Sequence, residues 1–231
     1  MVTLADFPTF STLLDEASRW YRAVPSKFPP VDLWDQYASA REFENAAVIE
    51  GLSSRRLRLQ ETHLGAMPPE EQLFGPGSTP VMAAFAYPNQ DGSRFSPGDY
   101  GVYYAGDTIE TVLAEVGYHR TRFWLDNPQQ PREQTFRIYV GKAIEPLVDI
   151  RGESAAGPLH DPDSWSESQR FGRGQRAADQ WGVRYRSVRY RGGECIALLR
   201  PLASTRVVQA SHIAMHFDGE SISTHICADT P

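Results

Sequence analysis

The stretch RFSPGDYGVYYAGDTIETVLAEV, residues 94–116, joins a turn-rich connection, a short strand and the start of a helix. Successive strand side chains point to opposite faces, so Tyr103 and Tyr104 in GVYYA lie on different sides of the predicted strand. One tyrosine can therefore belong to the core while the other lines a cleft. The fold prediction starts from this strand that feeds directly into a helix.

The helix that follows is predicted to begin at Asp107, whose carboxylate can cap the free backbone N–H groups, with Glu110 three residues later. Apolar residues then recur at helical spacing, which predicts one face turned to the core. That stripe consists of Ile109, Val112, Leu113 and Val116. Glu115 lies beside the stripe, on a flank with polar neighbours. Taken alone, it would be an ordinary surface glutamate.

Composition sets the broad class of protein. The chain has 231 residues, 41% of them hydrophobic, and a formal net charge of -6, which does not favour nucleic acid or acidic membranes as general partners. Two cysteines, Cys195 and Cys227, do not require a disulfide, so a cytoplasmic location is expected. The N-terminus lacks the features of a signal peptide, and no apolar run is long enough to span a bilayer.

The N-terminal part of the chain and the rest differ in their residue patterns. Residues 1–54 are predicted to be a helical extension, with helices near residues 13–24 and 34–51. Residues 55–231 are predicted to form an α+β domain, because short runs rich in β-branched and aromatic residues replace helical spacing. These runs are VMAAFAY (81–87), GVYYA (101–105), FRIYVGKA (136–143), VRYRSV (183–188), ECIALLRPL (194–202) and RVVQASHIAMHF (206–217).

A second polar stretch, WGVRYRSVRYRGGECIALL, spans residues 181–199. If residues 184–191 are extended, one face of the strand carries Tyr185, Ser187, Arg189 and Arg191. Three interpretations stay open: a basic edge strand protected from mispairing, a nucleic-acid patch, which the acidic composition disfavours, and a serine among arginines that binds a phosphate-containing ligand.

Together the two stretches resemble the RES domain, which is named for its arginine, glutamate and serine. The resemblance covers roughly residues 55–217. It implies a fold like that of ADP-ribosyltransferases, with a mixed or antiparallel sheet. Characterised RES proteins are bacterial toxins that degrade NAD by cleaving the nicotinamide–ribose bond. The resemblance also implies an antitoxin partner with a helix-turn-helix DNA-binding domain.

The resemblance also assigns site residues. The matching catalytic positions are Arg94, Tyr104, Glu115 and Ser187, and the further substrate-binding candidates are Arg56, Arg58, Tyr103 and Arg189. Arg56 and Arg58 are alternatives for an earlier arginine of the domain. Which of Tyr103 and Tyr104 faces the ligand stays open.

The chemistry of NAD cleavage suits these residue types. Breaking the bond creates an oxocarbenium-like ribose, which a carboxylate such as Glu115 can stabilise. A guanidinium such as Arg94 matches the pyrophosphate oxygens. The chain lacks the G-x-G-x-x-G fingerprint, so NAD is expected as a substrate and not as a redox cofactor. No other cofactor or metal is expected, while inorganic phosphate is a candidate co-substrate.

The sequence leaves four alternatives to NAD cleavage. Transfer of ADP-ribose onto a protein is the main alternative, because the sequence does not identify the acceptor. A serine hydrolase using Ser187 and His119 lacks the G-x-S-x-G elbow. A non-catalytic binding module is disfavoured because all four catalytic positions are filled. A metal site is also disfavoured, because its candidate ligands alternate with apolar residues as in a strand. These ligands are His212, His216, His225 and Cys227.

Overall fold

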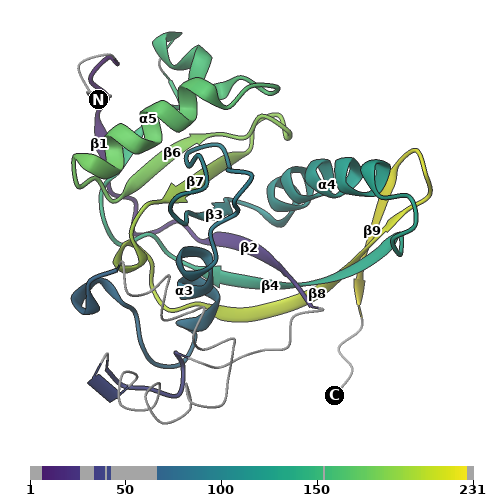
Figure 1. The fold of residues 1–231 in the computed structure, drawn as a ribbon, viewed down its shortest axis with the longest axis horizontal. Coiled ribbons are helices and arrows are strands. Elements are labelled where there is room, and N and C mark those ends of the chain that lie inside the picture. Colours follow the sequence, from purple (N-terminus) through teal and green to yellow (C-terminus); the bar gives the residue numbers. More distant parts are fainter. Residues whose placement is uncertain (1–6, 27–33, 40, 43–66, 153, 228–231) are drawn as a thin grey trace.

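The computed structural model describes residues 7–26, 34–39, 41–42, 67–152 and 154–227. Nine strands of these residues form one sheet, in the order β1-β5-β6-β7-β3-β2-β4-β8-β9 (Figure 1). The β5–β6 pair is parallel and the other neighbours are antiparallel. The expected α+β class is therefore confirmed, with a mostly antiparallel sheet.

The strands follow the β-rich runs of the sequence, apart from the changes described below. In sheet order they are β1 (Thr12–Leu13), β5 (Leu147–Asp149), β6 (Gly182–Arg186), β7 (Glu194–Leu198), β3 (Tyr103–Gly106), β2 (Trp20–Pro25), β4 (Glu133–Gly141), β8 (Val208–Phe217) and β9 (Ile222–Cys227). Short 3-10 turns occur at η2 (Pro69–Glu71), η3 (Ser154–His160) and η4 (Pro201–Ala203).

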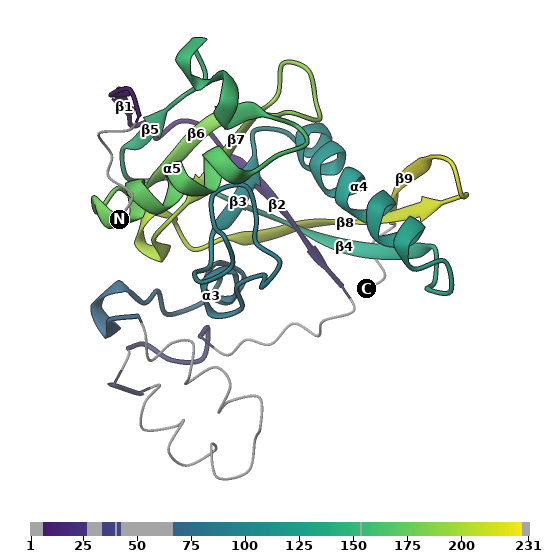
Figure 2. The same cartoon turned by 45° about the horizontal axis from the view of Figure 1, so that its top comes forward.

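Three α-helices of the described residues cover the sheet, α3 (Thr79–Ala86), α4 (Ile109–Asp126) and α5 (Ser166–Ala177). Figure 2 shows α4 and α5 over one side of the sheet and α3 over the other. The core follows the same division, since Tyr103 packs in the cluster that includes α3, and Tyr104 packs against the cluster that includes α5. The predicted alternation of the two tyrosines is confirmed. Among the described residues, no helix has the length and hydrophobicity needed to cross a bilayer.

Helix α4 begins one residue later than predicted. Thr108, not Asp107, is the N-cap, and its Oγ1 accepts a hydrogen bond from Thr111 N at 3.1 Å. Asp107 instead accepts a hydrogen bond from the Thr111 hydroxyl at 2.7 Å. The apolar stripe is confirmed where it meets the sheet, because Val112 is buried and Leu113 and Val116 pack against the cluster around Trp124. This packing fixes the rotation of the helix and therefore the direction of Glu115.

The helix predicted over residues 13–24 is wrong. Residues Trp20–Pro25 form β2, which lies between β3 and β4 and pairs with β4 at six positions. The aromatic and β-branched residues of WYRAV favour a strand once neighbouring strands are present, so tertiary pairing prevails over the helical spacing. The boundary proposed after residue 54 lies outside the described residues, but a sheet strand comes from the expected helical extension.

The strand predicted over residues 81–87 is also wrong, because this run forms most of α3. Alanine has the highest helix propensity, and Pro80 fits the first turn, where its missing N–H costs nothing. A short apolar run does not distinguish a buried strand from a buried helix.

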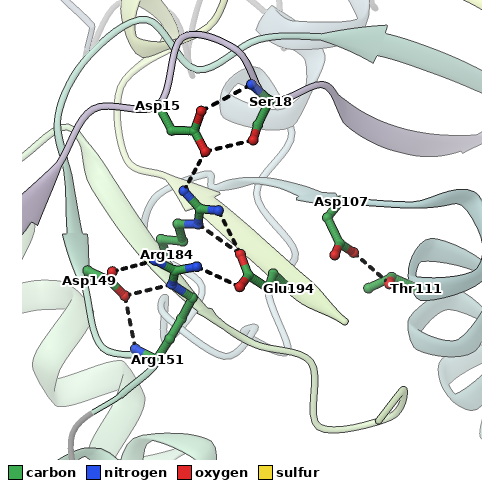
Figure 3. A network of polar contacts seen from close by, with 8 residues as sticks. All are labelled: Asp15, Ser18, Asp107, Thr111, Asp149, Arg151, Arg184 and Glu194. Atoms are coloured by element: carbon green, nitrogen blue, oxygen red, sulfur yellow. Dashed lines mark hydrogen bonds and ion pairs between the residues drawn. The ribbon is translucent and has the colours of Figure 1, made fainter. Parts of the chain in front are cut away.

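A network of ion pairs joins the N-terminal segment to the sheet, as Figure 3 shows. Arg184 on β6 donates to Asp15 at 2.9 Å and to Glu194 on β7 at 2.7 Å. Arg151 binds the other oxygen of Glu194 at 2.5 Å and Asp149 on β5 at 2.7 Å. Three strands and the segment before β2 are thus held by two guanidinium groups.

Phe171→Ala is expected to lower the free energy of unfolding by about 3–5 kcal/mol, measured by denaturant titration. Its ring is fully buried on α5 and makes edge contacts with Phe7 and Phe10, at centroid distances of 5.2 Å and 5.6 Å. Phe123→Ala is the matched control, because that ring is 37% exposed. A loss below about 1 kcal/mol at Phe171 would mean that α5 does not pack here.

Candidate active site

A cleft of about 310 Å³ lies against α4 and the residue that precedes α5. Its walls combine residues from β2, β3, α4, β6 and β7 with the loop before Arg94. Three of the four predicted catalytic residues line it, Arg94, Tyr104 and Glu115. The fourth, Ser187, touches the site through Glu115.

Glu115 and Ser187 are separated by 72 positions in the sequence but form a direct hydrogen bond. The Ser187 hydroxyl donates to Glu115 Oε1 at 2.6 Å, and Val188 N donates to the same oxygen at 3.2 Å. Ser187 Oγ in turn accepts hydrogen bonds from Arg189 N and Tyr190 N, at 3.2 Å and 2.9 Å. The loop after β6 thus holds one carboxylate oxygen, so the second oxygen is the one available to a ligand.

These contacts rule out the extended conformation that was considered for residues 184–191. Strand β6 ends at Arg186, and the chain then turns so that Ser187 N donates to Gly193 O. The backbone amides of this turn converge on the Ser187 hydroxyl. Tyr185 and Arg189 line the cleft, whereas Ser187 and Arg191 line a neighbouring cavity, so the four side chains do not share one face.

Tyr104 is the tyrosine that lines the cleft. Its hydroxyl accepts a hydrogen bond from Phe95 N and donates to Ser93 Oγ, both at 2.9 Å. Burial raises the pKa of Tyr104 to about 12, so the phenol is neutral at pH 7 and is a poor proton donor or acceptor for catalysis. Tyr104 therefore binds both neighbours of Arg94, the side chain of Ser93 and the backbone of Phe95. Tyr103, the other candidate, lies in the core at 1% exposure.

Arg94 has both a structural and a site-facing role. It is 8% exposed, and its Nη1 donates to the carbonyl oxygens of Leu159 and Asp161 at 3.2 Å and 2.9 Å. Part of the guanidinium therefore holds the loop that precedes α5. The side chain also lines the cleft, so an anionic group of a ligand can approach it there.

Arg22 is a site residue that the sequence prediction missed. It comes from β2, and its Nη1 donates to Tyr104 O at 3.0 Å while its guanidinium lies 4.7 Å from the Tyr103 ring centroid. Its Nε is buried without a hydrogen-bond partner. The helix predicted over residues 13–24 did not place Arg22 near Tyr104, whereas a strand over the same residues would have done so. Arg56 and Arg58, the arginines expected here, lie outside the described residues.

Arg189 closes one rim of the cleft. Its guanidinium lies 3.3 Å from the centroid of the Tyr118 ring on α4 and donates to Pro162 O. His119 and Trp165 line the cleft, and their ring centroids lie 5.8 Å apart. The rim of the cleft therefore provides aromatic rings that can pack against a planar ring of a ligand, while the floor of the cleft provides charged side chains.

The structure does not bring His119 to Ser187 as a serine hydrolase requires. Within the described residues, the Ser187 hydroxyl bonds a carboxylate and two backbone amides, and no histidine. The residues weighed as metal ligands lie on β8 and β9 as expected for strands, and no group of three or more potential ligands forms in the described ranges.

The comparisons with known proteins identify the family of this chain. The model of the RES domain matches residues 72–218, more than half of the chain. The protein therefore belongs to the RES domain family. The matched segment contains Arg94, Tyr104, Glu115 and Ser187, whereas Arg22 on β2 precedes it.

One individual protein and one solved structure are also similar to this chain. The chain is 27% identical over 208 residues to the uncharacterized protein y4oC of Sinorhizobium fredii (strain NBRC 101917 / NGR234). The alignment covers 88% of this chain and 85% of that protein. A chain in the crystal structure of the M. tuberculosis MbcT–MbcA toxin–antitoxin complex is similar at 14% identity, with a TM-score of 0.42, over 53% of this chain and 71% of that chain.

Proposed function

We propose that this protein cleaves the nicotinamide–ribosyl bond of NAD in the cleft around Glu115. The observation that carries the proposal is the position of the Glu115 carboxylate. One of its oxygens is fixed by Ser187 and Val188, and the residue lines a cleft together with three arginines, Arg22, Arg94 and Arg189. Membership of the RES family supports the same activity.

In the proposed reaction, the bond between ribose C1′ and the nicotinamide nitrogen breaks. Its electron pair moves onto the pyridinium nitrogen, so nicotinamide leaves as a neutral molecule without acid catalysis. Positive charge develops on the ribose, and the free oxygen of Glu115 accepts a hydrogen bond from a ribose hydroxyl and stabilises that charge. The oxygen of the acceptor then bonds to C1′ and releases its proton to solvent.

Arg22 and Arg94 are proposed to bind the pyrophosphate. Arg22 is a cation with a buried, unpartnered Nε, and within the described part of the chain no carboxylate pairs with it. A buried charge without a counterion is costly, and an anionic ligand relieves that cost. The guanidinium plane also matches two phosphate oxygens at once.

Arg22→Gln is expected to raise the KM for NAD about tenfold or more, because a charge-assisted contact to the pyrophosphate is lost. The control is Arg19→Gln, since Arg19 is exposed just before β2 and lies outside the cleft. Thermal unfolding of both variants separates binding from folding. An unchanged KM at Arg22 would remove this residue from the pyrophosphate site.

The acceptor is identified by product analysis. Purified protein is incubated with NAD in buffers with and without inorganic phosphate, and the products are separated by chromatography and weighed by mass spectrometry. ADP-ribose identifies water as the acceptor, a phosphorylated ADP-ribose identifies phosphate, and a mass increase on protein identifies a transferase. Intact NAD in every mixture, with unmodified protein, would refute the proposed activity.

We also propose a toxin role, with an antitoxin that carries a helix-turn-helix domain, because characterised RES proteins act in such pairs. Induced expression of the chain should stop bacterial growth and deplete NAD, and Glu115→Gln should do neither. Normal growth with active, abundant enzyme would contradict the toxin role.

A further inference from the structure

A second cavity, of about 460 Å³, adjoins the cleft. Ser187 lines this cavity, and Glu115, which accepts the Ser187 hydroxyl hydrogen, lines the cleft. The two spaces therefore meet at the Ser187–Glu115 hydrogen bond. The wall of the second cavity is formed by residues 186–188 and 191–194, together with Arg151 and His160.

The positive charge of the arginines that line this cavity is not balanced by its carboxylate, Glu194. Glu194 forms ion pairs with Arg151 and Arg184, at 2.5 Å and 2.7 Å, so its negative charge is already neutralised. Arg186 and Arg191 are exposed, and in the described ranges neither side chain forms an ion pair or a hydrogen bond. Two arginines whose guanidinium groups have no such partner therefore line one concave space.

The backbone and His160 give this cavity a fixed frame. Gly192 has a φ of +85°, and a Cβ there would meet nothing within 4 Å, so its backbone borders open space. His160 Nδ1 lies 2.9 Å from Ala156 O, and its Nε2 accepts a hydrogen bond from Arg186 N at 3.2 Å. Burial lowers the pKa of His160, which agrees with this neutral ring. The ring holds the end of β6 and leaves the Arg186 side chain free.

We propose that this cavity binds the phosphate group of a small molecule between Arg186 and Arg191, as a site separate from the cleft. Guanidinium groups bind phosphate oxygens through paired hydrogen bonds, and a glycine backbone allows close approach. The volume is in the range of small-molecule pockets. A concave space of this size favours a small phosphorylated ligand over an extended acidic peptide. The inference does not depend on NAD cleavage.

The test measures binding by calorimetry with three probes: inorganic phosphate, adenosine 5′-monophosphate and a hexaglutamate peptide. The wild-type protein should bind a phosphate probe saturably. The double variant R186Q/R191Q should bind it at least about tenfold more weakly. The control R19Q/K142Q removes two exposed cations outside both cavities and should bind as the wild type does. Tighter binding of the monophosphate identifies an ester as the ligand, and equal binding identifies free phosphate.

A second measurement locates the site without relying on the variants. In a nuclear magnetic resonance titration of the ¹⁵N-labelled wild type with phosphate, the amides of Gly192 and Gly193 should shift more than that of Gly106, which lines the cleft. Absence of saturable binding, equal affinity in R186Q/R191Q, shifts confined to the cleft, or tighter binding of hexaglutamate would each overturn the proposal.

Discussion

Glu115→Gln is expected to lower the rate of nicotinamide release from NAD at least about 100- to 1,000-fold, the size of effect seen when one electrostatic contact to a transition state is removed. Glutamine keeps the shape of the side chain and can still accept from Ser187. It lacks the negative charge that stabilises the developing positive charge on the ribose. The effect should therefore appear in kcat, with little change in thermal stability.

The matched control for this variant is Glu110→Gln. Glu110 lies in the first turn of the same helix, is exposed and does not line the cleft. Its substitution should leave the rate within about twofold. Equal rates in Glu115→Gln and the wild type would show that the carboxylate does not take part in the reaction.

Arg184→Met is expected to destabilise the protein by about 1.5–3 kcal/mol, the range for losing a hydrogen bond to a charged group, because its partners Asp15 and Glu194 are themselves 31% and 27% exposed. The Arg184 side chain is 10% exposed and joins Asp15 to Glu194. Its loss leaves Glu194 with Arg151 alone and releases the segment before β2. Because β2 carries Arg22, the cleft should lose affinity for NAD at the same time.

The control for this substitution is Arg173→Met. Arg173 pairs with Asp99, but the two side chains are 51% and 57% exposed. Exposed pairs contribute about 0–1 kcal/mol, so denaturant titration should show little change. Similar losses in the two variants would contradict a structural role for the Asp15–Arg184–Glu194 network.

The same network gives a pH dependence with a defined sign. Hydrogen bonds from Ser18 and from Arg184 lower the pKa of Asp15 from 3.8 to about 2. A carboxyl group whose pKa is lower in the folded state contributes stability above its unfolded pKa and loses it as the pH falls. The contribution of Asp15 is therefore complete above about pH 4 and disappears towards pH 2. This acid sensitivity should be smaller in Arg184→Met.

The sequence predicted the centre of the site because that part depends on local patterns. Alternation along β3 separated Tyr103 from Tyr104, and helical spacing fixed the direction in which Glu115 points. The resemblance to the RES domain named Ser187 as a partner residue. The structure brings Ser187 and Glu115 together in a hydrogen bond of 2.6 Å.

The remaining parts depend on contacts between distant segments, which local patterns do not contain. Strand β2 has its place only because β3 and β4 flank it, so Arg22 could not be placed in the site from helical spacing. The run at residues 81–87 shows the opposite case, in which alanine content outweighed an apparent β pattern. The turn after β6 likewise follows from hydrogen bonds onto Ser187 and not from strand alternation.

The most direct test of the central claim is the initial rate of nicotinamide release at increasing NAD concentrations, measured by chromatography for the wild type and Glu115→Gln side by side. The assay is run in both phosphate-free and phosphate buffers. Saturable release by the wild type, and its near absence in a folded Glu115→Gln protein, is the predicted result. Intact NAD with the wild type in both buffers, or equal release by the variant, would contradict the assignment of this cleft.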